Sequence, residues 1–139
     1  MKPLYTTVAV AHGGRDSRVR STEPPLDLPF APPRSLGGPG GNATNPEQLL
    51  AAGYAACFES ALRLVARMQK RALDEVEITA QVTLGQDDAG AFRIAVALHG
   101  RIPGVGREDL QALMEAAHKI CPYSNATRGN VDVKLVAES

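Results

Sequence analysis

The segment 44–70 constrains the fold more than any other, because it predicts one long helix whose first half has almost no polar side chain. Thr44 or Asn45 can cap the start of this helix, and Pro46 suits its first turn. Residues 49–58 have the sequence LLAAGYAACF, and a helix that is apolar on every face has to be buried. We therefore expect a long, buried central helix.

The second half of this helix is expected to be amphipathic, with Leu62, Val65 and Met68 facing inward. A second helix is predicted over Arg107–Ile120. It should end at Cys121, because the following proline disfavours helical geometry in the residue before it.

Alternation of apolar and polar residues predicts strands in the remaining segments. The predicted strands are Leu4–Val10, Arg18–Thr22, 26–30, Val76–Leu84, Ala91–His99 and Val131–Val136. Pro29 restricts its strand to an edge, because proline cannot donate a ladder hydrogen bond. Val76–Leu84 and Ala91–His99 should form a hairpin. Hairpins and helices without regular βαβ alternation indicate a single α+β domain over residues 1–139.

Composition argues against several classes of function. The 15 basic and 15 acidic residues cancel, and aromatic residues make up 4% of the chain, so no nucleic-acid partner is expected. The N-terminus has no secretory pattern, and no stretch approaches the ~20 apolar residues of a membrane span. We therefore expect a cytoplasmic protein without membrane insertion. Two cysteines are too few for a disulfide scaffold, so in a reducing compartment they are either inert or chemically active.

Residues 32–44 contain the run LGGPGG, which can hold neither a helix nor a strand. Such a run is either a flexible linker or a loop shaped to pass close to an active site. The residues alone leave both interpretations open.

Cys57 lies inside the central helix and Cys121 at the end of the second helix. Taken alone, a helical cysteine is usually a small core hydrophobe. A reactive thiolate needs a nearby positive charge. Arg15, in a glycine-bounded turn, can supply that charge, and its planar guanidinium can also hold the Glu47 carboxylate. Taken alone, Arg15 also fits an exposed arginine in a turn, and Glu47 also fits an ordinary acidic residue in the first turn of a helix.

Other kinds of site find little support. The histidines, His12, His99 and His118, are scattered, and no CxxC or HExxH spacing is present, so no metal site is expected. His118 lies close before Cys121, which suits a ligand pair, but a partly exposed helical histidine explains the spacing as well. The sequence contains no G-x-S-x-G elbow and no phosphate-binding loop.

Five segments form a pattern in a fixed order along the chain. They are GGRD at 13–16, LGGPGG at 36–41, TNPEQL at 44–49, AAGYAACF at 51–58 and CPYSNATRGN at 121–130. Together they resemble the organic hydroperoxide resistance (Ohr) proteins of the OsmC superfamily. The last run separates Ohr proteins from more distant OsmC relatives, and the resemblance covers nearly the whole chain.

The resemblance implies an OsmC/Ohr-like α+β fold, with antiparallel strands around the long buried helix, and an intertwined homodimer. It implies that Cys57 is the peroxidatic cysteine and Cys121 the resolving cysteine. Arg15 matches the arginine that stabilises the thiolate, and Glu47 matches the glutamate that holds this arginine.

The resemblance also implies an activity. Organic hydroperoxides, both alkyl and lipid, would be reduced to alcohols through a Cys57 sulfenic acid and a Cys57–Cys121 disulfide. Lipoyl groups on lipoylated proteins would be the reductant, and no metal, haem or flavin would be needed. The alternatives are a thiol redox sensor and a general peroxide-stress protein without high turnover.

Helix spacing adds a constraint of its own. Glu47 and Cys57 are 57 − 47 = 10 residues apart, which is ~15 Å along a helix axis. One arginine cannot easily reach both, so we expect each site to combine Glu47 of one subunit, with or without its Arg15, with the cysteines of the other. An apolar pocket would favour alkyl peroxides. Its candidate lining residues are Leu26, Leu28, Phe30, Leu36, Tyr54 and Phe58.

Overall fold

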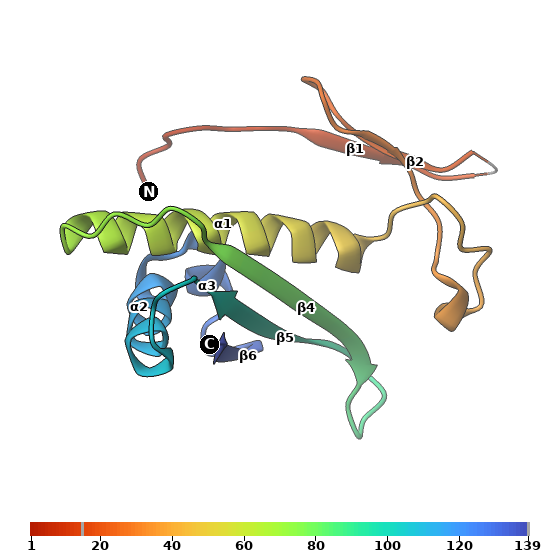
Figure 1. Ribbon diagram of the computed structural model, residues 1–139. Coiled ribbons are helices and arrows are strands. Elements are labelled where there is room, and N and C mark those ends of the chain that lie inside the picture. The colour runs from red at the N-terminus through yellow and green to blue at the C-terminus, as the bar shows by residue number, and fades with distance from the viewer. Residues whose placement is uncertain (15, 139) are drawn as a thin grey trace. The chain divides into compact units, whose positions relative to one another are not determined.

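The computed structural model describes residues 1–14 and 16–138. The chain divides into two compact units, Met1–Pro46 and Glu47–Ser139. Figure 1 shows the first unit in red and orange and the second in yellow to blue. The expectation of a single domain over residues 1–139 stays a prediction.

The first unit contains an antiparallel sheet with the strand order β1-β2-β3. Its elements are β1 (Ala9–His12), β2 (Arg18–Ser21), β3 (Asp27–Pro29) and a short 3-10 turn, η1 (Arg34–Leu36). Pro29 ends a strand at the edge of this order, as predicted. The prediction of a strand over Leu4–Val10 is wrong in its bounds, because ladder pairing begins at Ala9, opposite Ser21.

The glycine-rich loop after β3 has a defined structure. Its base is closed by a hydrogen bond from the Ala31 N–H to the Thr44 carbonyl (3.0 Å) and another from the Thr44 N–H to the Pro29 carbonyl (2.7 Å). A Cβ added at Gly38 would lie 2.0 Å from the Pro32 carbonyl oxygen, so the chain folds back on itself where only glycine fits. These contacts favour a shaped loop over a flexible linker.

The second unit contains the long helix, a mixed sheet and two shorter helices. Its elements are α1 (Pro46–Met68), β4 (Glu77–Gln86), β5 (Phe92–Arg101), α2 (Arg107–Ile120), α3 (Pro122–Thr127) and β6 (Asp132–Glu138). β4 and β5 form the predicted hairpin, which runs obliquely to α1 in Figure 1. β6 pairs with β5 in parallel, unlike the antiparallel pairs predicted. The crossover through α2 permits this pairing, because parallel neighbours need a long connection.

Pro122 determines both where α2 ends and where α3 begins. α2 has the predicted bounds, and it ends because Cys121 adopts extended geometry (φ −63°, ψ 124°), which the residue before a proline prefers. α3 was not predicted. Pro122, which stops the first helix, stands at the start of the second, where its fixed φ is favourable.

The core of the second unit joins α1, α2 and the sheet into one cluster, and Cys121 at the N-cap of α3 belongs to it. Its largest fully buried side chains are Tyr54, Phe58, Leu62, Leu98, Leu110, Leu113, Met114, Cys121 and Ser124. Apolar faces of α1 and α2 therefore pack where the helical pattern predicts.

Some apolar side chains of α1 are exposed in the described chain. Leu62 and Val65 face inward as predicted, but Met68 is 72% exposed. α1 is also long and apolar enough to span a membrane by length and composition, so the expectation that no stretch approaches that length is wrong. Core helices of soluble proteins meet the same criterion, and 33% of the apolar stretch is buried within this chain.

Candidate functional site

The two cysteines meet where α1 contacts the junction between α2 and α3. The Sγ atoms of Cys57 and Cys121 lie 3.5 Å apart. Both are free thiols. A disulfide needs a sulfur–sulfur distance of about 2.05 Å, so a short movement of either side chain would join them.

The position of Cys121 follows from the packing of α2. Leu110, Leu113 and Ala117 bury one face of this helix. The Cys121 N–H closes the helix by donating to the Ala117 carbonyl at 2.9 Å. The extended backbone at Cys121 then ends the helix, and its side chain is 0% exposed in the core cluster that contains α1 residues.

The two thiols differ in exposure and therefore in what can reach them. Cys57 is partly exposed, whereas Cys121 is completely buried. Burial raises the pKa of the Cys57 thiol above its ordinary value of 9.0, a backbone hydrogen bond from Tyr123 acts in the opposite direction, and Cys121 raises the pKa further. The described surroundings thus favour the neutral thiol of Cys57 at neutral pH, and thiolate chemistry there requires a cation.

Of the two charged residues of the predicted site, the structure describes Glu47 only. Glu47 lies in the first turn of α1, and the continuous helix keeps it ~15 Å along the axis from Cys57. Among residues 1–14 and 16–138, none forms an ion pair with Glu47. Arg15 lies outside the described residues.

The residues predicted to line an apolar pocket fall in both units. Those of the first unit are Leu26, Leu28, Phe30 and Leu36. Leu28 and Leu36 are 38% and 58% exposed, so they are open to contact. Tyr54 and Phe58 of the second unit have no exposed surface, because they pack in the core. A role for these residues in binding a peroxide stays a prediction.

A partly buried row of hydrogen-bonded polar groups lies beside the cysteines. The Tyr54 hydroxyl is 3.0 Å from the Ser124 Oγ and 3.2 Å from the Thr127 Oγ1. The Ser124 Oγ is also 2.8 Å from the His118 Nδ1. Burial, together with the positive charge of Arg128, lowers the pKa of His118. The imidazole is therefore neutral at neutral pH.

Tyr123 packs α3 against α1. Its ring centroid lies 5.5 Å from that of Tyr54, with the rings tilted by 51°. A Cβ added at Gly53 would lie 2.6 Å from the Tyr123 hydroxyl, so glycine at this position leaves the space that the hydroxyl occupies. The Tyr123 backbone also hydrogen-bonds the Cys57 thiol. Gly53, Tyr54 and Cys57 of α1 thus all contact Tyr123 of α3.

Sequence reasoning missed the row of polar groups and the contact of Tyr123. The run 121–130 contains Tyr123 and Ser124, but it indicates a family and not a contact. The signal that could have found the Tyr54–Ser124 contact is the three-residue spacing of Tyr54 from Cys57 and of Ser124 from Cys121, taken together with the expected pairing of the two cysteines. His118 is a partly exposed helical histidine, as predicted, but its contact with Ser124, six residues later, was not predicted.

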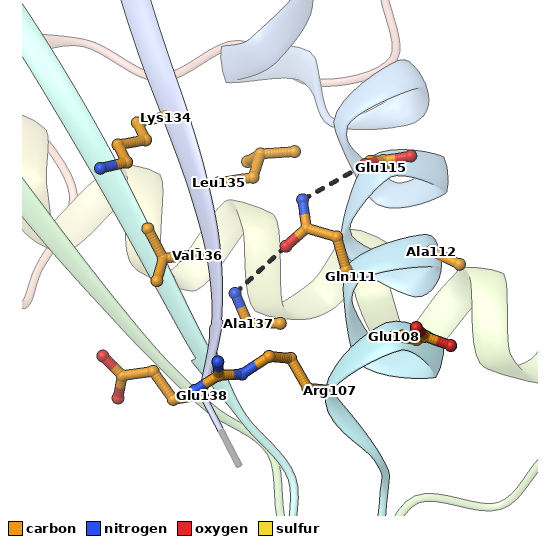
Figure 2. Close-up of a pocket in the computed structure, with 10 residues that line it drawn as sticks. All are labelled: Arg107, Glu108, Gln111, Ala112, Glu115, Lys134, Leu135, Val136, Ala137 and Glu138. Carbon is orange, nitrogen blue, oxygen red and sulfur yellow. Dashed lines mark hydrogen bonds between the residues drawn. The ribbon is translucent and has the colours of Figure 1, made fainter.

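A separate groove of about 720 Å³ lies between α2 and β6. Figure 2 shows Gln111 spanning it, with its amide oxygen accepting from the Ala137 N–H and its amide nitrogen donating to Glu115, each at 3.2 Å. The side chain thus covers a donor on the strand edge. The lining residues include neither cysteine nor histidine, so this groove is not where the thiols act.

Known proteins resemble the chain along nearly its whole length. Residues 38–136 match the family described as OsmC-like protein. The organic hydroperoxide resistance protein of Xanthomonas axonopodis pv. citri (strain 306) is 52% identical over 135 residues, which cover 96% of this chain and 94% of the relative. Organic hydroperoxide resistance protein OhrA of Bacillus subtilis (strain 168) is 48% identical over 143 residues, covering 99% of each.

A solved structure agrees with these relatives. The crystal structure of an organic hydroperoxide resistance protein from Legionella pneumophila is 55% identical and has a TM-score of 0.92, covering 99% of this chain and 100% of that one. The chain therefore belongs to the OsmC-like family and, within it, to the organic hydroperoxide resistance proteins. The predicted family and the predicted OsmC/Ohr-like α+β fold are confirmed.

Oxidation with diamide should link Cys57 to Cys121 within one chain, because their sulfurs lie 3.5 Å apart. Titration of free thiols should fall to zero, and peptide mapping without reduction should join the two cysteine peptides. Cys121→Ser should keep the Cys57 thiol titratable under the same treatment. Disulfides between chains as the main product would contradict the observed geometry.

Proposed function

We propose that the protein is a thiol peroxidase that reduces alkyl and lipid hydroperoxides to alcohols. The Cys57 thiolate attacks the distal peroxide oxygen, the O–O bond breaks, and the alkoxide takes up a proton and leaves as the alcohol. Cys57 becomes a sulfenic acid. The Cys121 sulfur then attacks the Cys57 sulfur, and the S–O bond breaks to release water as the disulfide forms.

The observation that carries this proposal is the reduced thiol pair with unequal exposure. A peroxide can approach Cys57, which is partly exposed, but not Cys121, which has no exposed surface. Cys121 has Cys57 as its neighbour at 3.5 Å. The accessible thiol therefore suits the attack on the peroxide, and the buried thiol suits the closure of the disulfide.

Activation of Cys57 requires a positive charge, because burial raises the pKa of its thiol. We assign this role to Arg15, with Glu47 holding the guanidinium in place. Arginine stays charged at all physiological pH values, and its fork can bind a carboxylate while a second edge faces a thiolate. Support comes from the likeness of the GGRD and TNPEQL segments to Ohr proteins.

We further propose a homodimer in which each site is shared between subunits. Glu47 and Cys57 lie on one continuous helix, ~15 Å apart along its axis. Two α1 helices packed antiparallel would bring Glu47 of one subunit toward the cysteines of the other. Apolar side chains that are exposed on α1, Leu64 at 43% and Met68 at 72%, support contact with a second subunit.

Turnover requires a dithiol that reopens the disulfide by exchange. We propose lipoyl groups on lipoylated proteins for this role, on the likeness of the cysteine segments to Ohr proteins. The thiol supplies both electrons to the peroxide, so the reaction needs no metal, haem or flavin. A reducing cytoplasm would keep the thiols ready, and α1 would be buried between subunits and not in lipid. With zero net charge, the chain is not expected to bind nucleic acid.

The wild-type protein should reduce tert-butyl hydroperoxide continuously with dihydrolipoamide as the reductant. Cys57→Ser should abolish the reaction because the nucleophile is lost. Cys121→Ser should allow one oxidation of Cys57, which a sulfenic-acid reagent traps, and should lose rapid turnover. A redox sensor would be oxidised once without turning over, so the absence of wild-type turnover would overturn the peroxidase assignment.

Arg15→Ala should slow the oxidation of Cys57 by roughly 10- to 100-fold at pH 7, because without the cation the pKa of the thiol stays above 9.0. A raised pKa means that the thiolate forms only as the pH rises. The rate of the variant should therefore climb about tenfold per pH unit toward pH 9.0, whereas the wild type should level off at lower pH. Stopped-flow mixing with peroxide across this range measures both profiles.

The control for this experiment is Arg18→Ala, which removes an exposed arginine that follows Arg15 closely in the sequence and pairs with Asp27. Its profile should match that of the wild type. Identical profiles for Arg15→Ala and the wild type would remove Arg15 from the mechanism.

Mixed dimers test the shared site directly. A dimer of one Cys57→Ser subunit and one Glu47→Ala subunit keeps one intact site if Glu47 acts across the interface. Such a dimer should have about half of the wild-type activity, although both parent homodimers are impaired. Co-expression with two affinity tags isolates it for the peroxide assay. A mixed dimer as impaired as its parents would place Glu47 and Cys57 of each site in the same chain.

A further inference from the structure

Two contacts join α1 to the start of α3 with the same spacing. Tyr54 and Cys57 are three residues apart on α1, and Cys121 and Ser124 are three residues apart at α3. The two sulfurs lie 3.5 Å apart, and the Tyr54 and Ser124 oxygens lie 3.0 Å apart. We infer that the buried Tyr54–Ser124 hydrogen bond holds the Cys121 thiol within reach of the sulfenic acid and so sets the rate of disulfide closure. This inference rests on the proposed function, because closure is its second step.

Counting protons shows that the hydrogen bonds run in one direction. The Thr127 hydroxyl donates to the Ser124 carbonyl at 3.2 Å, so its oxygen must accept the proton of Tyr54. Tyr54 has then used its proton, and Ser124 must donate to Tyr54. Ser124 in turn accepts from His118, whose Nδ1 carries a hydrogen. These hydrogen bonds therefore hold the Ser124 side chain from two sides, through Tyr54 and through His118.

α3 needs such an anchor because it cannot hold its own position. It has six residues, which is too short for a helix to be stable by itself. Its other contacts with α1 come from Tyr123, which is 38% exposed, and from Thr127, whose hydroxyl accepts from Tyr54. Tyr54 and Ser124 are both completely buried, so loss of either hydroxyl would leave the other group poorly paired in the core.

The two chemical steps depend differently on this anchor. The peroxide oxidises Cys57 without any bond to Cys121. Closure then requires the Cys121 sulfur to move from 3.5 Å to the bonding distance of about 2.05 Å as water leaves. A displaced α3 should therefore slow closure and leave the peroxide step nearly unchanged.

Tyr54→Phe and Ser124→Ala each remove the proposed anchor, and the first keeps the aromatic ring. Rapid-quench oxidation with one equivalent of tert-butyl hydroperoxide, followed by alkylation and mass spectrometry, separates sulfenic acid from disulfide. Closure should slow by about tenfold in each variant, whereas oxidation of Cys57 should change by less than about twofold. The double variant should be slowed by less than the product of the two single effects, because both substitutions break the shared Tyr54–Ser124 bond.

Two matched controls remove similar hydroxyls elsewhere. Tyr5→Phe changes a tyrosine that is 78% exposed. Ser60→Ala changes a serine on α1 that bonds the Ala56 carbonyl of its own helix. Both controls should close the disulfide at the wild-type rate.

The outcomes separate this inference from the proposed function. Unchanged closure in Tyr54→Phe, or equal slowing of both steps, would overturn the anchor. If Ser124→Ala fails to fold, Tyr54→Phe decides the question by itself. A wild type that forms neither sulfenic acid nor disulfide would instead overturn the proposed function.

The His118 ring provides a readout that does not depend on activity. Nitrogen NMR should find the hydrogen on Nδ1 in the wild type, and this preference should be lost in Ser124→Ala. A wild-type ring with its hydrogen only on Nε2 would contradict the direction of these hydrogen bonds and the anchoring of Ser124 from both sides.

Discussion

The contact between α1 and the α2–α3 junction is the constraint on which the site depends. It brings two cysteines that are 64 residues apart in sequence to a sulfur–sulfur distance of 3.5 Å. The core face of α2 delivers Cys121 to this point, and Gly53 leaves room for Tyr123 on α1. The sheet supplies the other side of the core in which Cys121 is buried. The scaffold thus fixes how near the two thiols lie and which of them a solute can reach.

The same burial works against the chemistry that we propose. Removing the Cys57 thiol from water raises its pKa, so the packing that orders the pair also favours the unreactive protonated form. Closing a disulfide gains from this burial, because the resolving thiol stays close and shielded. Forming a thiolate does not gain from it and requires a cation that stays charged in an apolar setting. Arginine meets this requirement better than lysine, whose own pKa falls on burial.

Local patterns in the sequence predicted the elements of this site better than its contacts. The bounds of α2 were predictable because proline fixes its end, but the same Pro122 also begins α3, which the pattern did not indicate. The apolar run predicted α1 but not which face would be covered, so Met68 was placed inward and is exposed. The Tyr54–Ser124 bond joins residues 70 positions apart, and no local pattern carries a contact at that separation.

The exposed apolar side chains of α1 and the spacing of its functional residues lead to the same conclusion. Leu64 and Met68 leave exposed apolar surface on α1, which the proposed second subunit would cover. Glu47 and Cys57 lie ~15 Å apart along the axis of this helix, which favours the proposal that each site combines residues of two chains. In the proposed dimer, the second subunit would cover this surface, and its α1 would carry Glu47 to the opposite cysteines. Burial of the apolar face and completion of the site would then be one event, so that assembly, stability and peroxide reduction are linked by mass action.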